Sequence, residues 1–339
     1  MNVASGPGVA ASAAKASQST LRARWVRRPP GVGFWVGVGL LSVYVAAAVS
    51  ALFVFEGSLD RLTERTQWVS SLHPIGPSSA HPFGIMPGFG TDLFRALWQA
   101  TPWDLGIVAS ILVIDVGLGL FLGGIAGLNE GGILDAIVTF VGDSVASIPA
   151  FLLVIVVLIG LATLAPQEVG LPAFVVVFGV VLWPTMARTV RERARVVGHE
   201  TFVEAARASG APFRRLLVRH VLPNSVGPVL AQVPLDVAPI FFVLAIIPWF
   251  VNCQAPAGPG GGSPTPVFLP HFPGFWPLPT FAFPEWGYLL GFGTCEGFSF
   301  PGGFSYWWMY LFPLLVILGL GLAIGLFCDG IDRWRRFDR

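Results

Sequence analysis

Long apolar segments separated by short polar ones run along most of this chain, and their length predicts membrane-spanning helices. A helix needs roughly 20 apolar residues to cross a hydrocarbon layer about 30 Å thick. Six segments reach this length and no repeat of roughly 20 to 50 residues is evident, which indicates one all-α domain with six transmembrane helices rather than a fused pair. They lie near residues 33–55, 104–128, 145–165, 172–190, 226–250 and 306–328.

The composition agrees with a chain whose solvent is mostly lipid. Of the 339 residues, 54% are hydrophobic and only 12% are charged, and the mean hydropathy is +0.72. Soluble domains carry roughly 25% charged residues. The formal net charge of +1 gives no indication of nucleic-acid binding, so the basic clusters are expected to face lipid and protein partners.

The positions of Lys and Arg predict the orientation of the helices. Cationic loops tend to stay in the cytoplasm, and the cations cluster before the first apolar segment, within 188–219 and at the C-terminus. Both termini and the loop 191–225 are therefore predicted to be cytoplasmic in a multi-pass protein of the inner membrane. Residues 1–32 form a polar tail, and the segment 33–55 is too long for a signal-peptide core, so we expect it to remain as the first helix.

Two long segments are predicted on the opposite side of the membrane, at residues 56–102 and 251–305. The second is rich in Pro, Gly and aromatic residues, which favours little regular helix and a cap over the outer mouth or against a partner. Cys253 and Cys295 both fall in it, where an oxidising compartment would permit a disulfide. The sequence leaves the paired and the unpaired state of these two thiols open.

The loop 191–225 contains the most informative pattern. Thr201 with Glu204 three residues later is typical of a capping box that opens a short helix, and Gly210 is a natural helix stop. Pro212 suits the first turn of a second helix, which Pro223 is expected to end. Two short helices at an angle are predicted, with small residues on a face that another protein can approach closely.

Glu204-Ala205-Ala206, followed by Gly210 and Leu222-Pro223, resembles the EAA loop of binding-protein-dependent ABC importers, a helix pair that seats in a groove of the ATPase subunit. The wider string VEAARASGAPFRRLLVRHVLPNSVGP is similar to the dipeptide, oligopeptide and nickel branch, of the DppC or OppC type. Arg207 and Arg214 are candidate salt-bridge partners for the ATPase. By this resemblance the coupling residues are Glu204, Ala205, Ala206, Arg207, Gly210, Arg214, Leu222 and Pro223.

Other positions resemble the same branch over roughly residues 33–339. They are His81-Pro82-Phe83-Gly84 with Gly90-Thr91-Asp92-Leu93, Asp135 and Asp143, Trp183-Pro184 with Arg188, Pro284-Glu285-Trp286-Gly287-Tyr288, and Asp329-Gly330. The chain departs from the family after the fifth apolar segment. There AIIPWFVNCQAPAG and an insertion of about thirty residues replace a compact turn.

The resemblance implies a type I ABC importer (MetI-like) permease fold over residues 103–339, preceded by the first helix. It implies a second homologous permease of the DppB or OppB type, two ATPase subunits and an extracytoplasmic substrate-binding protein as partners. Peptides are the substrate expected for the branch, with oligosaccharides or nickel as alternatives. Within this fold the permease encloses part of the translocation path and transmits movement from the ATPase.

The chain lacks the residues for ATP hydrolysis of its own. A P-loop needs a lysine that reaches the terminal phosphates, and the only lysine is Lys15 in the tail. The five histidines and three cysteines show no metal-ligand spacing, so no cofactor or metal is expected, and ATP with magnesium belongs to the partner subunits. The sequence therefore predicts a permease that is not itself an enzyme.

Asp115 and Asp236 lie near the middle of predicted spans, where an isolated charge costs about 3 kcal/mol or more. Each is therefore expected to face a partner or a water-filled path, and Asp143 is a further candidate polar position in a span. Structural pairing or pore lining is favoured. A proton-coupled carrier that uses Asp115 and Asp236 is an alternative of another class, and a membrane scaffold that moves nothing is a third.

Overall fold

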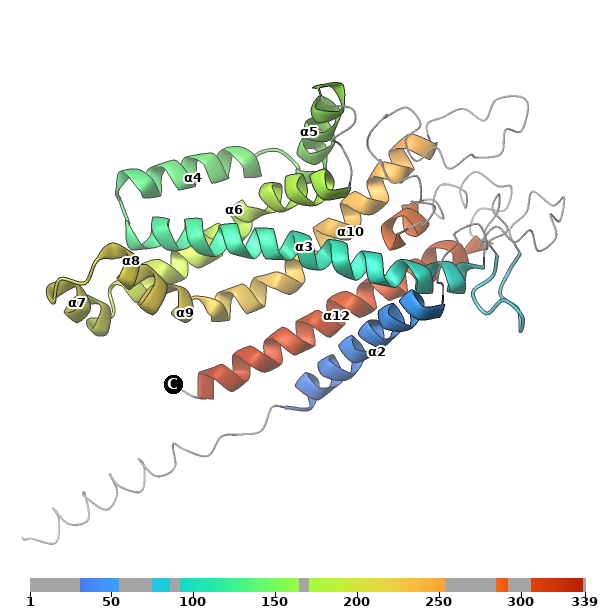
Figure 1. Ribbon diagram of the computed structural model, residues 1–339, viewed down its shortest axis with the longest axis horizontal. Coiled ribbons are helices and arrows are strands. Elements are labelled where there is room, and N and C mark those ends of the chain that lie inside the picture. The colour runs from blue at the N-terminus through green and yellow to red at the C-terminus, as the bar shows by residue number, and fades with distance from the viewer. Residues whose placement is uncertain are drawn as a thin grey trace, which may run out of the picture.

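The structure is a computed structural model, and every long element in the part of the chain that it describes is a helix (Figure 1). The described residues are 31–54, 75–85, 92–164, 171–253, 285–291 and 306–337. Five of the helices are long and apolar enough to cross a membrane. They are α2 (Val32–Val54), α3 (Leu93–Leu128), α6 (Leu171–Gly198), α10 (Val226–Cys253) and α12 (Trp308–Phe337).

The sixth predicted span is broken into two helices. α4 (Ile133–Ala146) and α5 (Ala150–Leu164) are apolar enough together, but they meet at an angle of 87°. In Figure 1, α4 runs beside α3 and α6, whereas α5 stands across them. Pro149 disfavours helical backbone at the residue before it, which accounts for the position of the break. The span predicted at 145–165 thus corresponds to α5, the second half of this bent pair, and the prediction missed α4.

Other helices extend beyond their predicted ends, among them α12, which continues to Phe337 rather than stopping near residue 328. α3 begins at Leu93 rather than near residue 104, because Asp92 caps it: a side-chain oxygen of Asp92 accepts a hydrogen bond of 3.0 Å from the backbone N–H of Arg95. α6 continues to Gly198 rather than stopping near residue 190. The extra turns of α6 contain cations that pair with carboxylates on neighbouring elements. Because these charges are compensated, this stretch forms a helix rather than a solvated loop.

α3 and α6 approach closely along a glycine stripe. Gly119, Gly123 and Gly127 recur every four residues on α3, and a methyl group at Gly123 would overlap the carbonyl oxygen of Ala187 on α6. Spacing of this kind lets membrane helices pack backbone against backbone, which gains dispersion energy where lipid supplies no hydrophobic driving force. The stripe makes these two helices the rigid centre of the bundle.

Residues 75–85 fold over the beginning of α3. Their contacts show the structural role of the motif His81-Pro82-Phe83-Gly84. His81 Nδ1 lies 2.8 Å from a carboxylate oxygen of Asp92, the residue that caps α3. Phe83 stacks on Phe312 of α12 with ring centroids 4.0 Å apart. Gly84 has a φ of +81°, which only glycine adopts without strain. The motif therefore fixes this segment to α3 and α12.

The described part of the Pro/Gly/aromatic insertion lies within the bundle. Residues 286–291 form a short helix, while most of the segment 251–305 lies outside the described residues, so little regular helix in it stays a prediction. Trp286 is fully buried, stacks near Phe241 of α10, and donates from its ring N–H to the carbonyl of Leu97 on α3 at 2.9 Å. α10 also runs to Cys253, past the predicted start of this segment. Residues 254–284 and 292–305 lie outside the described residues.

Candidate functional site: the α7–α9 hairpin and its ionic support

The predicted helix pair is present between α6 and α10. It consists of α7 (Thr201–Ala208), α8 (Phe213–Leu216), a π-helical turn η3 (Leu217–Val221) and α9 (Leu222–Asn224), and we call it the α7–α9 hairpin. Figure 1 shows it at one end of the bundle, beyond the ends of α3 and α6. The prediction of a capping box is wrong. Glu200 is the N-cap residue of α7, and its side chain forms no capping hydrogen bond. The N–H of Glu204 bonds to the carbonyl of Glu200 at 3.0 Å.

Gly210 ends α7 as the sequence predicts. It has a φ of +79°, and its N–H bonds to the carbonyl of Arg207 at 3.0 Å, while the N–H of Ala211 bonds to that of Ala206 at 3.0 Å. This pair of bonds is a Schellman motif, which satisfies carbonyls left free at a helix end. The glycine therefore sets the angle between the two short helices.

Pro223 does not end the second helix, which continues to Asn224. Instead the helix widens into the π turn before Pro223, where the N–H of Leu222 bonds to the carbonyl of Leu217. A proline ring crowds the carbonyl four residues earlier, and the extra residue in the turn relieves that contact. The carbonyl of Pro223 accepts a hydrogen bond of 2.9 Å from Arg335 of α12, which ties the hairpin to the last helix.

One face of the hairpin is packed against the long helices. Val203, Leu216, Leu217 and Val221 are buried and form a cluster with Ala194 and Val197 of α6. Ile125 and Leu128 at the end of α3 pack against the same cluster. Ala206 is half-buried and also contacts it, so this alanine supports the hairpin from within. The hairpin and the ends of α3 and α6 thus form one packed unit.

The opposite face is exposed and carries both apolar and cationic groups. Phe202 is 46% exposed and Phe213 is 43% exposed, one on each short helix. Glu204, Ala205, Arg207 and Arg214 are exposed as well. None of the three charged side chains among these forms an ion pair with a described residue. Exposed aromatic rings beside unpaired arginines are the composition of a protein-binding surface rather than of a merely solvated loop.

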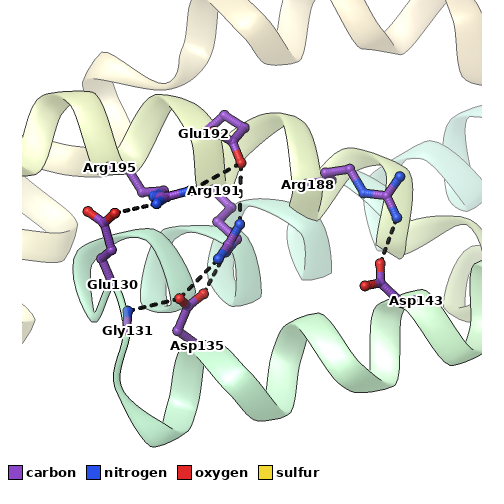
Figure 2. A network of polar contacts seen from close by, with 8 residues as sticks. All are labelled: Glu130, Gly131, Asp135, Asp143, Arg188, Arg191, Glu192 and Arg195. Carbon is purple, nitrogen blue, oxygen red and sulfur yellow. Dashed lines mark hydrogen bonds and ion pairs between the residues drawn. The ribbon is translucent and has the colours of Figure 1, made fainter.

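Three arginines on α6 hold α4 and the turn before it (Figure 2). Arg188, Arg191 and Arg195 are spaced by three and four residues, so they lie on one face of the helix. The fork of Arg191 binds both carboxylate oxygens of Asp135 at 2.5 and 3.0 Å, and Asp135 also accepts from the N–H of Gly131 at 3.0 Å. Such bidentate contacts fix orientation as well as distance.

The other two arginines extend this network at either end. Arg195 pairs with Glu130, and Arg188 lies 2.7 Å from Asp143. Arg195 and His199 hold the pKa of Glu130 below its ordinary value, so this contact stabilises the fold at neutral pH and is lost as the pH falls through that lowered pKa. Asp143, predicted as an intramembrane polar residue, is an exposed member of this network.

Asp115 and Asp236 meet inside the bundle. Asp115 of α3 is 0% exposed and Asp236 of α10 is 4% exposed, and their carboxyl groups interact directly. Gln232 donates to one oxygen of Asp236 at 2.9 Å. Neither carboxyl has a cationic partner among the described residues. The sequence predicted that each aspartate faces a partner or a water-filled path, but not that each would be the partner of the other.

Sequence reasoning missed the arginine network, the glycine stripe and a second buried carboxyl cluster at Asp104 and Glu285. The arginine spacing and the glycine spacing were both visible as signals in the sequence.

The candidate disulfide between Cys253 and Cys295 lies outside the described side chains. Cys328 is buried and unpaired in α12. Among the described residues, no group of three or more His, Cys, Asp and Glu side chains is placed to hold a metal ion.

Comparison with known proteins identifies the family. Residues 119–336 match the binding-protein-dependent transport system inner membrane component. The chain belongs to this family. It is thus a multi-pass inner-membrane permease subunit of an ABC importer, without an ATPase domain or a cofactor of its own. A binding protein and an ATPase are implied as its partners. The family and its fold confirm the resemblance found in the sequence.

Relatives of this permease carry related names. A putative peptide transport system permease protein of Brucella suis is 28% identical over 298 residues, which cover 88% of this chain and 85% of that protein. The dipeptide transport system permease protein DppC of Bacillus subtilis is 26% identical over 324 residues, 95% of this chain and 87% of the relative. A glutathione transport system permease protein of Pectobacterium atrosepticum is 28% identical over 256 residues, 76% and 72% of the two chains.

Proposed function

We propose that this permease imports short peptides and couples their passage to ATP hydrolysis through the α7–α9 hairpin. The observation that carries the coupling role is the two-faced hairpin: one face is packed on α3 and α6, and the other presents Phe202, Phe213 and unpaired arginines. The relatives named above support the substrate, since two of the names contain a peptide or a dipeptide and glutathione is itself a tripeptide.

The hairpin works as a lever in this proposal. A second, homologous permease encloses the other half of the path, and two ATPase subunits seat against the two hairpins. The cluster around Val203 and Leu217 transmits a movement of the hairpin to α3 and α6 without slack, because its members are buried and close-packed. Arg191 carries α4 along with α6 through its fork on Asp135. Arg335 extends the same unit to α12.

The proposed substrate is tested by uptake into proteoliposomes that contain this permease, its partner permease, the ATPase subunits and the binding protein. We expect ATP-dependent uptake of labelled dipeptides and tripeptides, and no uptake of an oligosaccharide or of nickel. Uptake of nickel or sugar in place of peptide would overturn the substrate. Uptake that persists without the ATPase subunits and collapses with the proton gradient would indicate a secondary carrier instead.

The coupling role is tested by Ala205→Glu on the exposed face of α7. A bulky charge there blocks close approach of the ATPase, so peptide uptake should fall about tenfold or more while the permease stays folded. Val196→Glu is the matched control, since Val196 is 55% exposed on α6 outside the hairpin, and it should leave uptake within about twofold. Equal uptake by the Ala205→Glu variant and the unaltered complex would overturn the coupling role.

A further inference from the structure

Asp115 and Asp236 form an isolated acidic pair in the interior of the helix bundle. Counted along the helix axis, Asp115 lies about 20 Å from the end of α3 next to the hairpin, and Asp236 about 15 Å from the corresponding end of α10. Both side chains therefore lie several turns inside helices that are apolar enough to cross a membrane, and the surrounding helices close them off from solvent. Each residue is more than nine-tenths buried.

The hydrogen-bond partners of this pair are incomplete. Both carboxyl oxygens of Asp115 and one oxygen of Asp236 are buried without a donor from the described residues. The other oxygen of Asp236 accepts from Gln232, which lies one turn earlier on α10. Two ionised carboxylates supply acceptors only, so their direct approach leaves both groups unsatisfied and mutually repelled. One proton shared between the two carboxyl groups would give them a hydrogen bond and remove the repulsion.

No cation among the described residues acts on either carboxyl group. On the side of α3 that faces α6, the nearby residues Met186 and Val190 are apolar. On α10 the neighbours Val229 and Val233 are apolar too, and Gln232 is neutral. The nearest cations of α6, Arg188 and Arg191, are held by Asp143 and Asp135. Within the described part of the chain, the titratable group that acts on Asp115 is Asp236, and the reverse also holds.

A second buried acidic cluster in the same chain shows the alternative arrangement. Glu285 accepts backbone N–H groups of Gly287 and Tyr288, both at 2.7 Å, and one oxygen of Asp104 accepts that of Trp286 at 3.0 Å, while the other oxygen of Asp104 has no partner among the described residues. Backbone donors can compensate a buried negative charge in this way. Among the described residues, no backbone N–H donates to the Asp115–Asp236 pair, and a single bound proton would supply the hydrogen bond that the two carboxyl groups lack.

We propose that Asp115 and Asp236 form a proton-binding site that joins α3 to α10. The proton resides on Asp115, which donates it to the free oxygen of Asp236, while Gln232 donates to the other oxygen. The step is a proton binding and no covalent bond is exchanged: the proton enters from water when the pair closes and returns to water when the two helices part. The site does not depend on the identity of the transported solute.

Infrared difference spectroscopy of the complete transporter in lipid nanodiscs tests this site. The spectrum of the unaltered complex at neutral pH, minus that of the Asp115→Asn complex, should contain the carbonyl band of a protonated carboxylic acid, and this band should shift in heavy water. Asp143→Asn is the matched control, because Asp143 is an exposed carboxylate paired with Arg188, and it should remove carboxylate bands only.

Three outcomes would overturn the proposal. One is a difference spectrum for Asp115→Asn that contains carboxylate bands alone. Another is a protonated band that disappears when sodium is added at constant pH, which would indicate a metal cation between the carboxylates. Should Asp115→Asn fail to assemble, the same band is followed in the unaltered complex and in Asp236→Asn, and the third outcome would be a band of identical frequency in both, because the proton on Asp115 would then form no bond to Asp236. Peptide uptake is not measured, so these outcomes are independent of the proposed function.

Discussion

Single glycines decide how closely the helices of this permease approach one another. Gly123 of α3 faces the backbone of Ala187 on α6, and an added methyl group would meet the carbonyl oxygen of Ala187 and the side chain of Val190. Gly117 lies on the same helix, but nothing comes within 4 Å of a methyl group placed there. Two glycines six residues apart therefore have different roles, one in packing and one at an open surface.

Gly123→Val should destabilise the permease by about 1–3 kcal/mol, because overpacking forces α3 away from α6. Gly117→Val is the matched control and should change stability by less than about 0.5 kcal/mol. Thermal unfolding of the two variants in the same detergent measures the difference. Equal unfolding temperatures for both would show that the glycine stripe does not set the contact between α3 and α6.

At the scale of elements, the broken span is held by charge rather than by apolar packing alone. α4 exposes large apolar side chains, Ile133 at 79% and Phe140 at 73%, and turns its carboxylates toward α6. The pair between Arg191 and Asp135 is largely buried, whereas that between Arg188 and Asp143 is largely exposed. A charge-assisted bond contributes more where water is excluded, so the first pair should dominate.

Arg191→Glu should reduce stability by about 1–3 kcal/mol, because it leaves Asp135 buried without its donors and adds a like charge beside it. Arg188→Glu is the control and should cost about 0–1 kcal/mol, since its pair is exposed. Combining Arg191→Glu with Asp135→Arg should restore part of the loss, as chemical denaturation of the purified protein would measure. No recovery in the double variant would show that the two residues do not act as a pair.

At the scale of the whole molecule, residues 75–85 and the α7–α9 hairpin lie at opposite ends of the bundle. Residues 75–85 contact the beginning of α3, and the α7–α9 hairpin packs on its end, which is about 54 Å away for a helix of 36 residues. This length exceeds the thickness of a bilayer. The hairpin and residues 75–85 are therefore placed to lie on different sides of the membrane.

The cation-rich hairpin is expected on the cytoplasmic side. Starting from a variant without the three native cysteines, Ala208→Cys should react with a membrane-impermeant maleimide only after the cells are permeabilised. Ser79→Cys, in the segment at the other end, should react in intact cells. Both positions are exposed, so burial does not hide either thiol. Labelling of Ala208→Cys in intact cells would reverse the proposed orientation.

Much of this protein follows from local sequence. The apolar segments predicted the five unbroken spans, because the length needed to cross lipid is a property of each segment alone, whereas they did not predict the break between α4 and α5. The helix–glycine–helix pattern of the hairpin was likewise local: Gly210 adopts the left-handed conformation and closes a Schellman motif with residues three to five positions earlier. The EAA pattern around Glu204 was sufficient by itself to indicate the family, because its residues lie within one short stretch of chain.

Tertiary structure decided which distant residues meet. Asp115 and Asp236 are 121 residues apart, and their contact depends on how α3 and α10 pack, which no local pattern specifies. The same holds for Arg191 with Asp135, and for the insertion residue Trp286, which lies inside the bundle rather than over its mouth. Hydrophobic length and turn chemistry act within a few residues, whereas pairing of buried charges is a property of the packed helices.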